Sequence, residues 1–318
     1  MESRMNDANL YGFTLAISVL LAALAVDRVA GEYPAPLHPV VWIGTTIGKL
    51  DSVYRKIGGF LGGLLFVATV EAAFIIPLYV AIYYLTPFVL IQAILMIFFL
   101  KAAFSIRGMN DHVRPIISAL ESGDMESARK HLSMVVRRDT SGMEPGFICS
   151  AAIETVSEGF VDGVLSPLFY FSIFGLAGAL FFRIANTFDS NIAYKDARNF
   201  AFGKFAAIVD TILNYIPARL SALIIYSVAS AKRIRPASYD MMPAAAIPDS
   251  TNAGWSIGAM SNCLGVRLEK KGEYVFNPDF RNPGVNDVKQ ALSIFNFASY
   301  LSVLILLVPL MIFIYTVL

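Results

Sequence analysis

The stretch Ile57–Leu100, IGGFLGGLLFVATVEAAFIIPLYVAIYYLTPFVLIQAILMIFFL, decides the fold, because Glu71 is its only charged residue. A helix needs about 20 apolar residues to cross a hydrocarbon core of roughly 30 Å. The stretch is long enough for two such helices, and Thr86-Pro87 interrupts it. It predicts a hairpin of two membrane spans. The glycine pairs at 58–59 and 62–63 suit close helix packing.

Other uncharged runs extend this pattern along the chain, at Leu10–Val26, Gly163–Phe182 and Gln290–Leu318. A signal peptide is the alternative for the first run, but the residues before it are nearly neutral and no small-residue cleavage site follows. Residues 205–231 are mostly apolar yet contain polar side chains and a proline, which suits an interior span or a re-entrant helix.

The composition agrees with a protein that lies in lipid, since 56% of the 318 residues are hydrophobic and 15% are charged. We therefore expect an all-α, polytopic bundle of about four or five spans with interfacial or re-entrant helices. A net charge of +1 gives no pull toward nucleic acid. The expected single membrane-embedded domain, 1–318, divides into N-terminal spans (1–106), polar helices such as Ser127–Arg137 (107–162), apolar helices with site motifs (163–231), a polar loop (232–289) and a last span (290–318).

The distribution of basic residues predicts the orientation of the spans. Arg28, Lys49, Arg55 and Lys56 lie between the first two spans, and Lys101, Arg107 and Arg114 follow the third. Cytoplasmic loops carry an excess of lysine and arginine. Both of these polar regions are therefore expected to face the cytoplasm, which places the N-terminus outside.

A ladder of carboxylates is the strongest sign of chemistry. Glu154, Glu158 and Asp162 are spaced by four residues, so a helix brings them roughly onto one face, where like charges repel. They lead directly into the uncharged run at 163–182, where unpaired acids cost several kcal/mol. The ladder predicts a counter-cation, either Mg²⁺ or basic side chains. A solvated face at the membrane edge is the alternative.

Two further clusters carry polar groups beside apolar helices. Asn186, Thr187 and Asp189 offer the hard oxygen ligands that suit Mg²⁺ and phosphate, although a capped helix start explains them equally well. Asp210 and Asn214 lie four residues apart on a segment that also holds Pro217 and Arg219. Proline in an apolar helix frees backbone carbonyls, often in a cavity wall, whereas an ordinary kink is the alternative.

Two basic positions also attract attention. Arg138 follows Arg137 and precedes Asp139, and adjacent guanidiniums clamp phosphate or carboxylate oxygens. A basic cluster at the membrane edge is the other explanation. His38 has no second histidine at metal-ligand spacing, which disfavours zinc, and it lies close to Trp42 in what could be an interfacial aromatic belt. The chain's cysteines are most simply small buried hydrophobes.

The ordered motifs resemble the adenosylcobinamide-phosphate synthase family of cobalamin biosynthesis, also called CobD or CbiB. The resemblance runs from about residue 27 to residue 274. It rests on Asp27-Arg28, Gly31-Glu32, Leu37-His38-Pro39-Val40-Val41-Trp42-Ile43-Gly44, Arg138-Asp139-Thr140, Ile153-Glu154-Thr155 through Glu158 and Asp162-Gly163 to Pro167-Leu168-Phe169-Tyr170, Asn186-Thr187-Phe188-Asp189-Ser190, Asp210 to Leu220, and Asn252-Ala253-Gly254-Trp255. The sequence departs from the family's pattern at Arg137, Gly159, Thr211 and Thr251.

The resemblance implies ATP-dependent amide formation between adenosylcobyric acid and aminopropanol phosphate, or ethanolamine phosphate, with Mg²⁺ as the metal. It suggests metal binding by Glu154, Glu158 and Asp189, and a catalytic role for Asp162, Asp210 or Asp139. The residues expected to bind ATP or the other substrates are His38, Arg138, Asn186, Thr187, Lys204, Asn214, Arg219, Asn252 and Trp255.

The expected partners are the corrinoid, the amino-alcohol phosphate, membrane lipid and other membrane-bound enzymes of cobalamin synthesis. The expected location is the cell membrane, with the active site on its cytoplasmic side. The alternative function is that of a membrane transporter or a corrinoid-binding scaffold, because intramembrane acids and proline-broken helices also build solute pathways.

Overall fold

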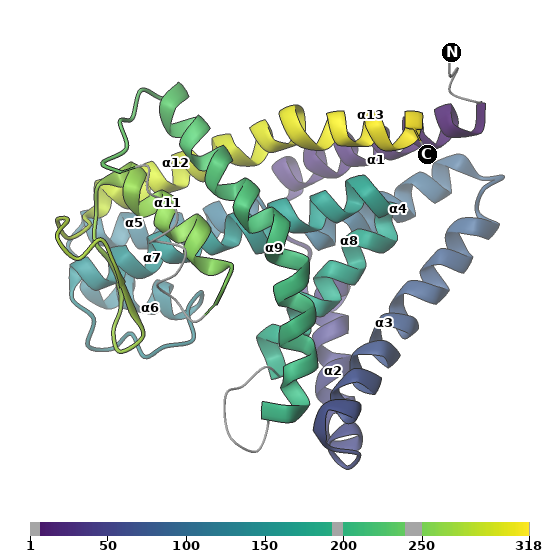
Figure 1. Cartoon of the computed structure of the whole chain (residues 1–318), viewed down its shortest axis with the longest axis horizontal. Helices are drawn as coiled ribbons and strands as arrows, with labels where there is room; N and C mark the ends of the chain where they lie inside the picture. The colour runs from purple at the N-terminus through teal and green to yellow at the C-terminus, as the bar shows by residue number, and fades with distance from the viewer. Residues whose placement is uncertain (1–6, 193–199, 239–249, 318) are drawn as a thin grey trace. The chain divides into compact units, whose positions relative to one another are not determined.

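A computed structural model describes residues 7–192, 200–238 and 250–317. Most of these residues are helical (Figure 1). In chain order the elements are α1(Asp7–Ala30), η1(Ala35–Leu37), α2(Pro39–Arg55), α3(Gly59–Tyr84), α4(Val89–Ala103), α5(Arg107–Glu121), α6(Met125–Ser133), α7(Pro145–Phe160), η2(Val161–Leu165), α8(Ser166–Ile192), α9(Phe200–Ala231), α11(Ala253–Leu264), β1(Leu268–Lys270), β2(Tyr274–Phe276), α12(Val285–Ser302), η3(Val303–Leu307) and α13(Val308–Val317).

The predicted hairpin is confirmed as α3 and α4, joined by a short turn (Figure 1). Pro77 lies inside α3 without ending it, as membrane helices tolerate. The turn is closed by a backbone hydrogen bond of 2.8 Å from the Phe88 N–H to the Leu85 carbonyl. The side-chain amide of Gln92 donates to the Ile82 carbonyl across the turn at 3.0 Å.

In the described part of the chain, six helices are long and apolar enough to cross a membrane, at Leu10–Ala30, Gly59–Tyr84, Val89–Glu121, Pro145–Ile192, Ala201–Ala231 and Val285–Thr316. The chain is thus an all-α, multi-pass membrane protein, as its composition predicted. The count exceeds the expected four or five. One reason is that α9 continues through Pro217 as one helix, so its polar residues do not interrupt it.

The chain divides into two compact units, each with many contacts among its own residues. Unit 1 comprises Met1–Ser105, Ser166–Leu213 and Leu304–Leu318, and unit 2 comprises Ile106–Leu165 and Asn214–Val303. Whether they function as the single membrane-embedded domain expected from the sequence stays a prediction.

In unit 1, helices α2, α3 and α8 enclose an apolar core. The ring of Phe66 stacks on that of Tyr54 at 4.8 Å and meets Phe188 edge-on at 4.9 Å. A side chain at Gly63 would collide with the backbone of Phe202, so the glycine permits close approach of the two segments. This agrees with the packing role predicted for the glycine pairs.

In unit 2, α7 is the central helix and packs against α5, α6, α11, α12 and β1. Two sequence-based expectations are corrected here. The segment 232–289 is not simply a polar loop, because its small and apolar residues form the buried helix α11 and a β1–β2 hairpin with Leu268 opposite Phe276. The helix expected at Ser127–Arg137 is α6, which begins earlier because Asp124 accepts a capping hydrogen bond from the Ser127 N–H at 3.0 Å.

Lys101 also differs from its expected position. The orientation argument counted it as a loop charge, but its side chain is completely buried and its ammonium lies 3.2 Å from both Asp27 and Glu32. It therefore does not count as one of the charges that orient the helices. The outward N-terminus stays a prediction that depends on the remaining basic residues.

Candidate functional site

The central helix of unit 2 positions two of the three carboxylates in the ladder. Glu154 and Glu158 lie one turn apart on α7, and Glu154 is only 7% exposed. Asp162 lies beyond the end of α7, in the π-helical turn η2. A spacing of four residues does not keep one face in a π-turn, so the one-face geometry applies to the two glutamates alone.

A basic side chain supplies part of the positive charge that the carboxylate ladder requires. The Arg138 guanidinium contacts the Glu154 carboxylate at 2.8 Å. The ladder was predicted to need either Mg²⁺ or basic side chains, and the structure contains a basic side chain at this position. Arg138, which was predicted to bind substrate, therefore lies beside Glu154, which was predicted to bind the metal.

Tyr274 completes this group from the β-hairpin, with its hydroxyl oxygen buried. Burial, together with the negative charges of Glu154 and Glu158, raises the pKa of the Tyr274 phenol above its ordinary value. The phenol is therefore protonated at neutral pH and is a hydrogen-bond donor. Sequence reasoning missed Tyr274, because a tyrosine in a polar segment has no spacing signal that links it to a helix more than 100 residues earlier.

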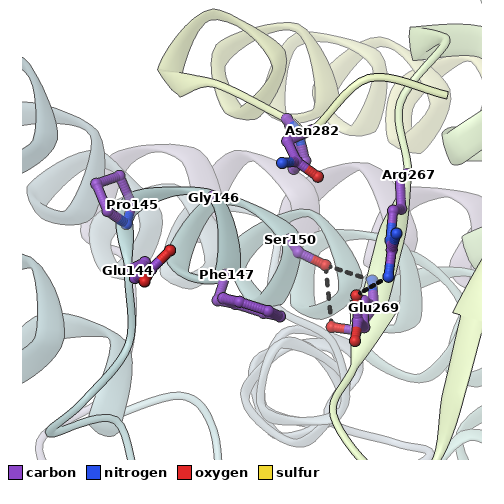
Figure 2. A pocket seen from close by; sticks show the side chains of 9 residues that line it. Glu144, Pro145, Gly146, Phe147, Ser150, Arg267, Glu269 and Asn282 are labelled. Carbon is purple, nitrogen blue, oxygen red and sulfur yellow. Dashed lines mark hydrogen bonds and ion pairs between the residues drawn. The ribbon is translucent and has the colours of Figure 1, made fainter. Parts of the chain in front are cut away.

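Two cavities adjoin at the start of α7, with volumes of about 510 and 400 Å³. Glu144, Phe147 and Glu269 line both of them, and Figure 2 shows the larger one. Arg138 and Asp139 line the smaller. Cavities of 300 to 1,000 Å³ with a few convergent polar groups are typical of small-molecule sites. The predicted Arg138-Asp139 pair therefore borders a space that can hold a ligand.

Asp139 is held as an anion within its own loop. Its carboxylate accepts hydrogen bonds from the backbone N–H of Ser141 at 2.9 Å and from the Ser141 hydroxyl at 3.0 Å. These hydrogen bonds lower the pKa of Asp139 below its ordinary value. Such a carboxylate is a weak base, so this geometry favours a role in shaping the loop.

The structure brings together three of the predicted binding residues, Arg219, Asn252 and Trp255. The Arg219 guanidinium stacks over the Tyr215 ring at 3.4 Å and lies 4.9 Å from the Trp255 ring. It also donates to the side-chain oxygen of Asn252 at 3.4 Å. Asn214, the residue directly before Tyr215 on the same helix, is buried. Stacking fixes the guanidinium plane, which suits recognition of a planar anionic group.

In unit 1 the structure joins Asn186 to Asp210. The Asn186 amide donates to the Asp210 carboxylate at 3.2 Å, and Arg183 donates to the Asn186 side-chain oxygen at 3.3 Å. The Thr187 hydroxyl donates to its own helix, at the Arg183 carbonyl. Arg183 was missed in the sequence, although a single arginine inside an apolar run is itself a signal.

Two other predicted residues of unit 1 have less defined surroundings. Asp189 is partly buried near the end of α8, and Lys204 is exposed near the start of α9. Each makes an interaction within the chain. Their predicted roles stay predictions.

His38 belongs to a polar cluster of unit 1 at the ends of α1 and α4. The Val40 N–H donates to Nδ1 of His38 at 3.2 Å, so the proton of the neutral ring lies on Nε2, which donates to Glu32 at 3.0 Å. Both ring nitrogens are thus occupied inside the chain. This geometry favours a positioning role for His38 over direct contact with a substrate.

The partner of His38, Glu32, is an anion with three donors. Burial alone would raise its pKa, but hydrogen bonds from His38 and Ser105 and the charge of Lys101 lower the pKa of Glu32 to about 2. None of Glu32, Lys101 and Asp27 was named from the sequence as a site residue. The signal available was Asp27 at the end of one uncharged run and Lys101 at the end of another.

The predicted metal ligands do not form a ready site. Among the residues that the structure describes, no group of three or more histidine, cysteine, aspartate or glutamate side chains could hold a metal ion. Glu154 and Glu158 lie together in unit 2, whereas Asp189 belongs to unit 1. The three-residue ligand set therefore stays a prediction.

Comparisons with known proteins extend these observations. A family model described as "CobD/Cbib protein" matches residues 20–299. A "Probable cobalamin biosynthesis protein CobD" from Thermoplasma volcanium is 40% identical over 297 residues, which cover 93% of this chain and 98% of the relative.

Two more relatives carry that same description. The protein from Pyrococcus abyssi is 40% identical over 90% of this chain and 94% of its own length. The protein from Methanocaldococcus jannaschii is 32% identical over 91% of this chain and 96% of its own length. No solved structure matches the chain. The match over residues 20–299 includes both the carboxylates of α7 and the cluster around His38, and the chain belongs to the CobD/CbiB family.

Proposed function

We propose that the protein is a cobalamin-biosynthesis enzyme that joins adenosylcobyric acid to aminopropanol phosphate, or to ethanolamine phosphate, in an ATP-dependent amide ligation. The family membership and the names of the relatives support a role in cobalamin biosynthesis. The observation that carries the ligation is the group on α7, where Glu154, one of two glutamates a turn apart, pairs with Arg138, which lines a cavity.

The chemistry explains why such a group is needed. A carboxylate is a poor acyl donor to an amine, so ATP would first transfer its terminal phosphoryl group to the corrinoid carboxylate, releasing ADP. The amine would then attack the carbonyl carbon, forming the C–N bond and releasing phosphate. A base must take the proton that the amine loses. Asp162 or Asp210 remains our candidate for that base.

The α7 group fits Mg²⁺ that arrives with a nucleotide. Mg²⁺ usually keeps several waters and is held by one or two carboxylates together with substrate phosphates, as Glu154 and Glu158 would allow. The bound ion would neutralise charge on the phosphates. Arg138, already beside Glu154, is suited to grip a phosphate oxygen, and Lys204 and Arg219 are the further candidates.

Membrane placement fits an amphipathic corrinoid. We propose that the protein lies in the cell membrane with its active site on the cytoplasmic side, where ATP is available. Binding at the edge of the bilayer would concentrate the corrinoid and pass the product to other membrane-bound enzymes of the pathway.

The test uses purified full-length protein with adenosylcobyric acid, aminopropanol phosphate and Mg-ATP. We expect an amide product and ADP in equal amounts. Ethanolamine phosphate, in a parallel reaction, identifies the preferred amine. Absence of both products with either amine would overturn the ligase and leave the transporter or scaffold as the better explanation.

A further inference from the structure

The larger of the two cavities has a wall that the function proposed above does not use. It lies between the first turn of α7 and a segment made of Arg267 and the strand β1, which includes Glu269 (Figure 2). Its volume of about 510 Å³ suits a small molecule, and a corrinoid is too large for it. None of Glu144, Phe147 and Arg267 was selected from the sequence as a site residue.

Two hydrogen bonds join helix α7 to strand β1 at the wall of the cavity. The Ser150 hydroxyl donates to the Glu269 carbonyl at 3.2 Å and accepts from the Glu269 N–H at 2.8 Å. Both backbone groups of one strand residue are therefore attached to α7 by a single side chain, as the dashed lines in Figure 2 show. A ligand would find this wall already formed.

One side of the cavity presents donors for an anion. Arg267 lines it, and an ion pair with Glu269 holds the guanidinium against the wall through one terminal nitrogen. A guanidinium has five N–H donors, so the ion pair leaves donors for a ligand. Asn282 adds a side-chain amide to the same lining.

The start of α7 lines the same cavity and adds further hydrogen-bond donors for an anion. The helix has 16 residues, Pro145 is its first, and the side chain of Glu144 does not cap it. The first N–H groups of a helix have no partner within the helix, and the helix dipole favours negative charge there. Gly146 has no side chain to cover its own N–H, and a Cβ there would first meet Asn282 at 3.8 Å.

The acidic residues of the lining define the ligand further. Glu144 and Glu269 bring negative charge to the same cavity. These carboxylates would repel a bare dianion. A phosphate that carries a cation, either a covalently attached ammonium or a bound Mg²⁺, can pair its phosphate with the donors and its cation with the carboxylates.

We infer that the cavity formed by the first turn of α7 and Arg267 binds the phosphate group of a cation-bearing phosphate monoester or Mg-nucleotide. This inference rests on the proposed function, in that both small substrates of the ligation have this chemistry. It assigns the phosphate of one of these two substrates to residues outside the Arg138–Glu154 pair.

The test measures binding and needs no turnover. Isothermal titration calorimetry on the full-length protein in detergent would use ethanolamine phosphate, Mg-bound non-hydrolysable ATP and vesicles containing phosphatidic acid as separate ligands. We expect the wild type to bind both soluble ligands, as the ligation requires, and at least one of them in a way that depends on Arg267. Binding only to the lipid vesicles, or to none of the three, would overturn the inference.

Variants locate the site. Arg267→Met should weaken binding about 10- to 100-fold, the loss expected for one charge-assisted hydrogen bond, and Arg267→Lys should recover part of it. Lys271→Met is the matched control, because Lys271 is a cation of the same hairpin that lines the neighbouring cavity instead. Loss of binding in Lys271→Met with none in Arg267→Met would place the phosphate in the other cavity and refute the assignment.

The outcome is separable from the proposed function. If the wild type makes the amide but Arg267→Met binds both soluble ligands normally, the cavity assignment fails and the ligase stands. If Arg267-dependent binding is present but no amide forms with either amine, the ligase fails and the phosphate site stands.

Discussion

Replacing Lys101 by methionine tests whether the buried ion pairs of unit 1 stabilise the fold. The Lys101 side chain is completely buried and Asp27 is 1% exposed, with 3.2 Å between the ammonium and the carboxylate. Methionine fills a similar volume but leaves the Asp27 charge without its principal counter-charge. Breaking a buried pair by removing one partner costs about 3–5 kcal/mol. At roughly 2–4 °C per kcal/mol for domains of comparable size, the melting temperature should fall by about 10 °C.

Glu32 should contribute little to that loss. Its side chain is 31% exposed, and it keeps the hydrogen bonds from His38 and Ser105 when Lys101 is removed. The double variant Asp27→Asn/Lys101→Met removes both charges of the buried pair. We expect it to regain most of the lost stability, because neutral groups of similar shape can replace a buried ion pair at little cost.

A thiol-reactive fluorophore in detergent micelles provides the assay, since Cys149 and Cys263 are buried and react only when the protein unfolds. Each variant is heated beside the wild type and the temperature of half-maximal labelling is compared. A single variant within 2 °C of the wild type, or a double variant as unstable as the single one, would refute the reasoning.

Three more predictions follow from individual side chains. Glu154→Gln and Glu158→Gln should each abolish amide formation while the protein stays folded in the membrane, which activity assays and thiol labelling measure together; near wild-type rates would remove both residues from the site. Glu71→Gln should leave the melting temperature unchanged or raise it, because neither carboxyl oxygen of this buried side chain has a hydrogen-bond partner in the described structure, and a clear decrease would reveal a role for the charge. The pKa of Glu32 is lowered to about 2 in the folded protein, so its stabilising effect is complete above its ordinary pKa and is lost as the pH falls toward 2; Glu32→Gln should therefore flatten the melting temperature between pH 4.5 and pH 2, and equal slopes in both proteins would contradict this.

Much of the membrane architecture could be predicted from the sequence, because it depends on local composition. Long uncharged runs form helices in lipid whatever their neighbours are, since every backbone group must be satisfied within the segment. The hairpin of α3 and α4 and its break near Thr86 follow from that rule alone. The polar segment at 232–289 lacked such a constraint, so α11 and the β-hairpin could not be predicted.

The candidate site divides in a similar way. Helical periodicity was enough to pair Glu154 with Glu158, and the need to compensate buried charge was enough to predict a cation nearby. Arg138 was already a candidate, but its contact with Glu154 depends on the path of a loop. Tyr274 and Arg267 reach α7 only because the hairpin packs there.

The sequence by itself determined that the chain is helical, lies in a membrane and carries acids that need a counter-charge, because hydropathy and helical spacing are local properties. The tertiary structure decided which cation meets which acid, and that Lys101 is a buried partner of Asp27 and Glu32 instead of a surface charge. Ion pairs and cavities form between segments distant in the chain, so their geometry depends on packing that no single segment encodes.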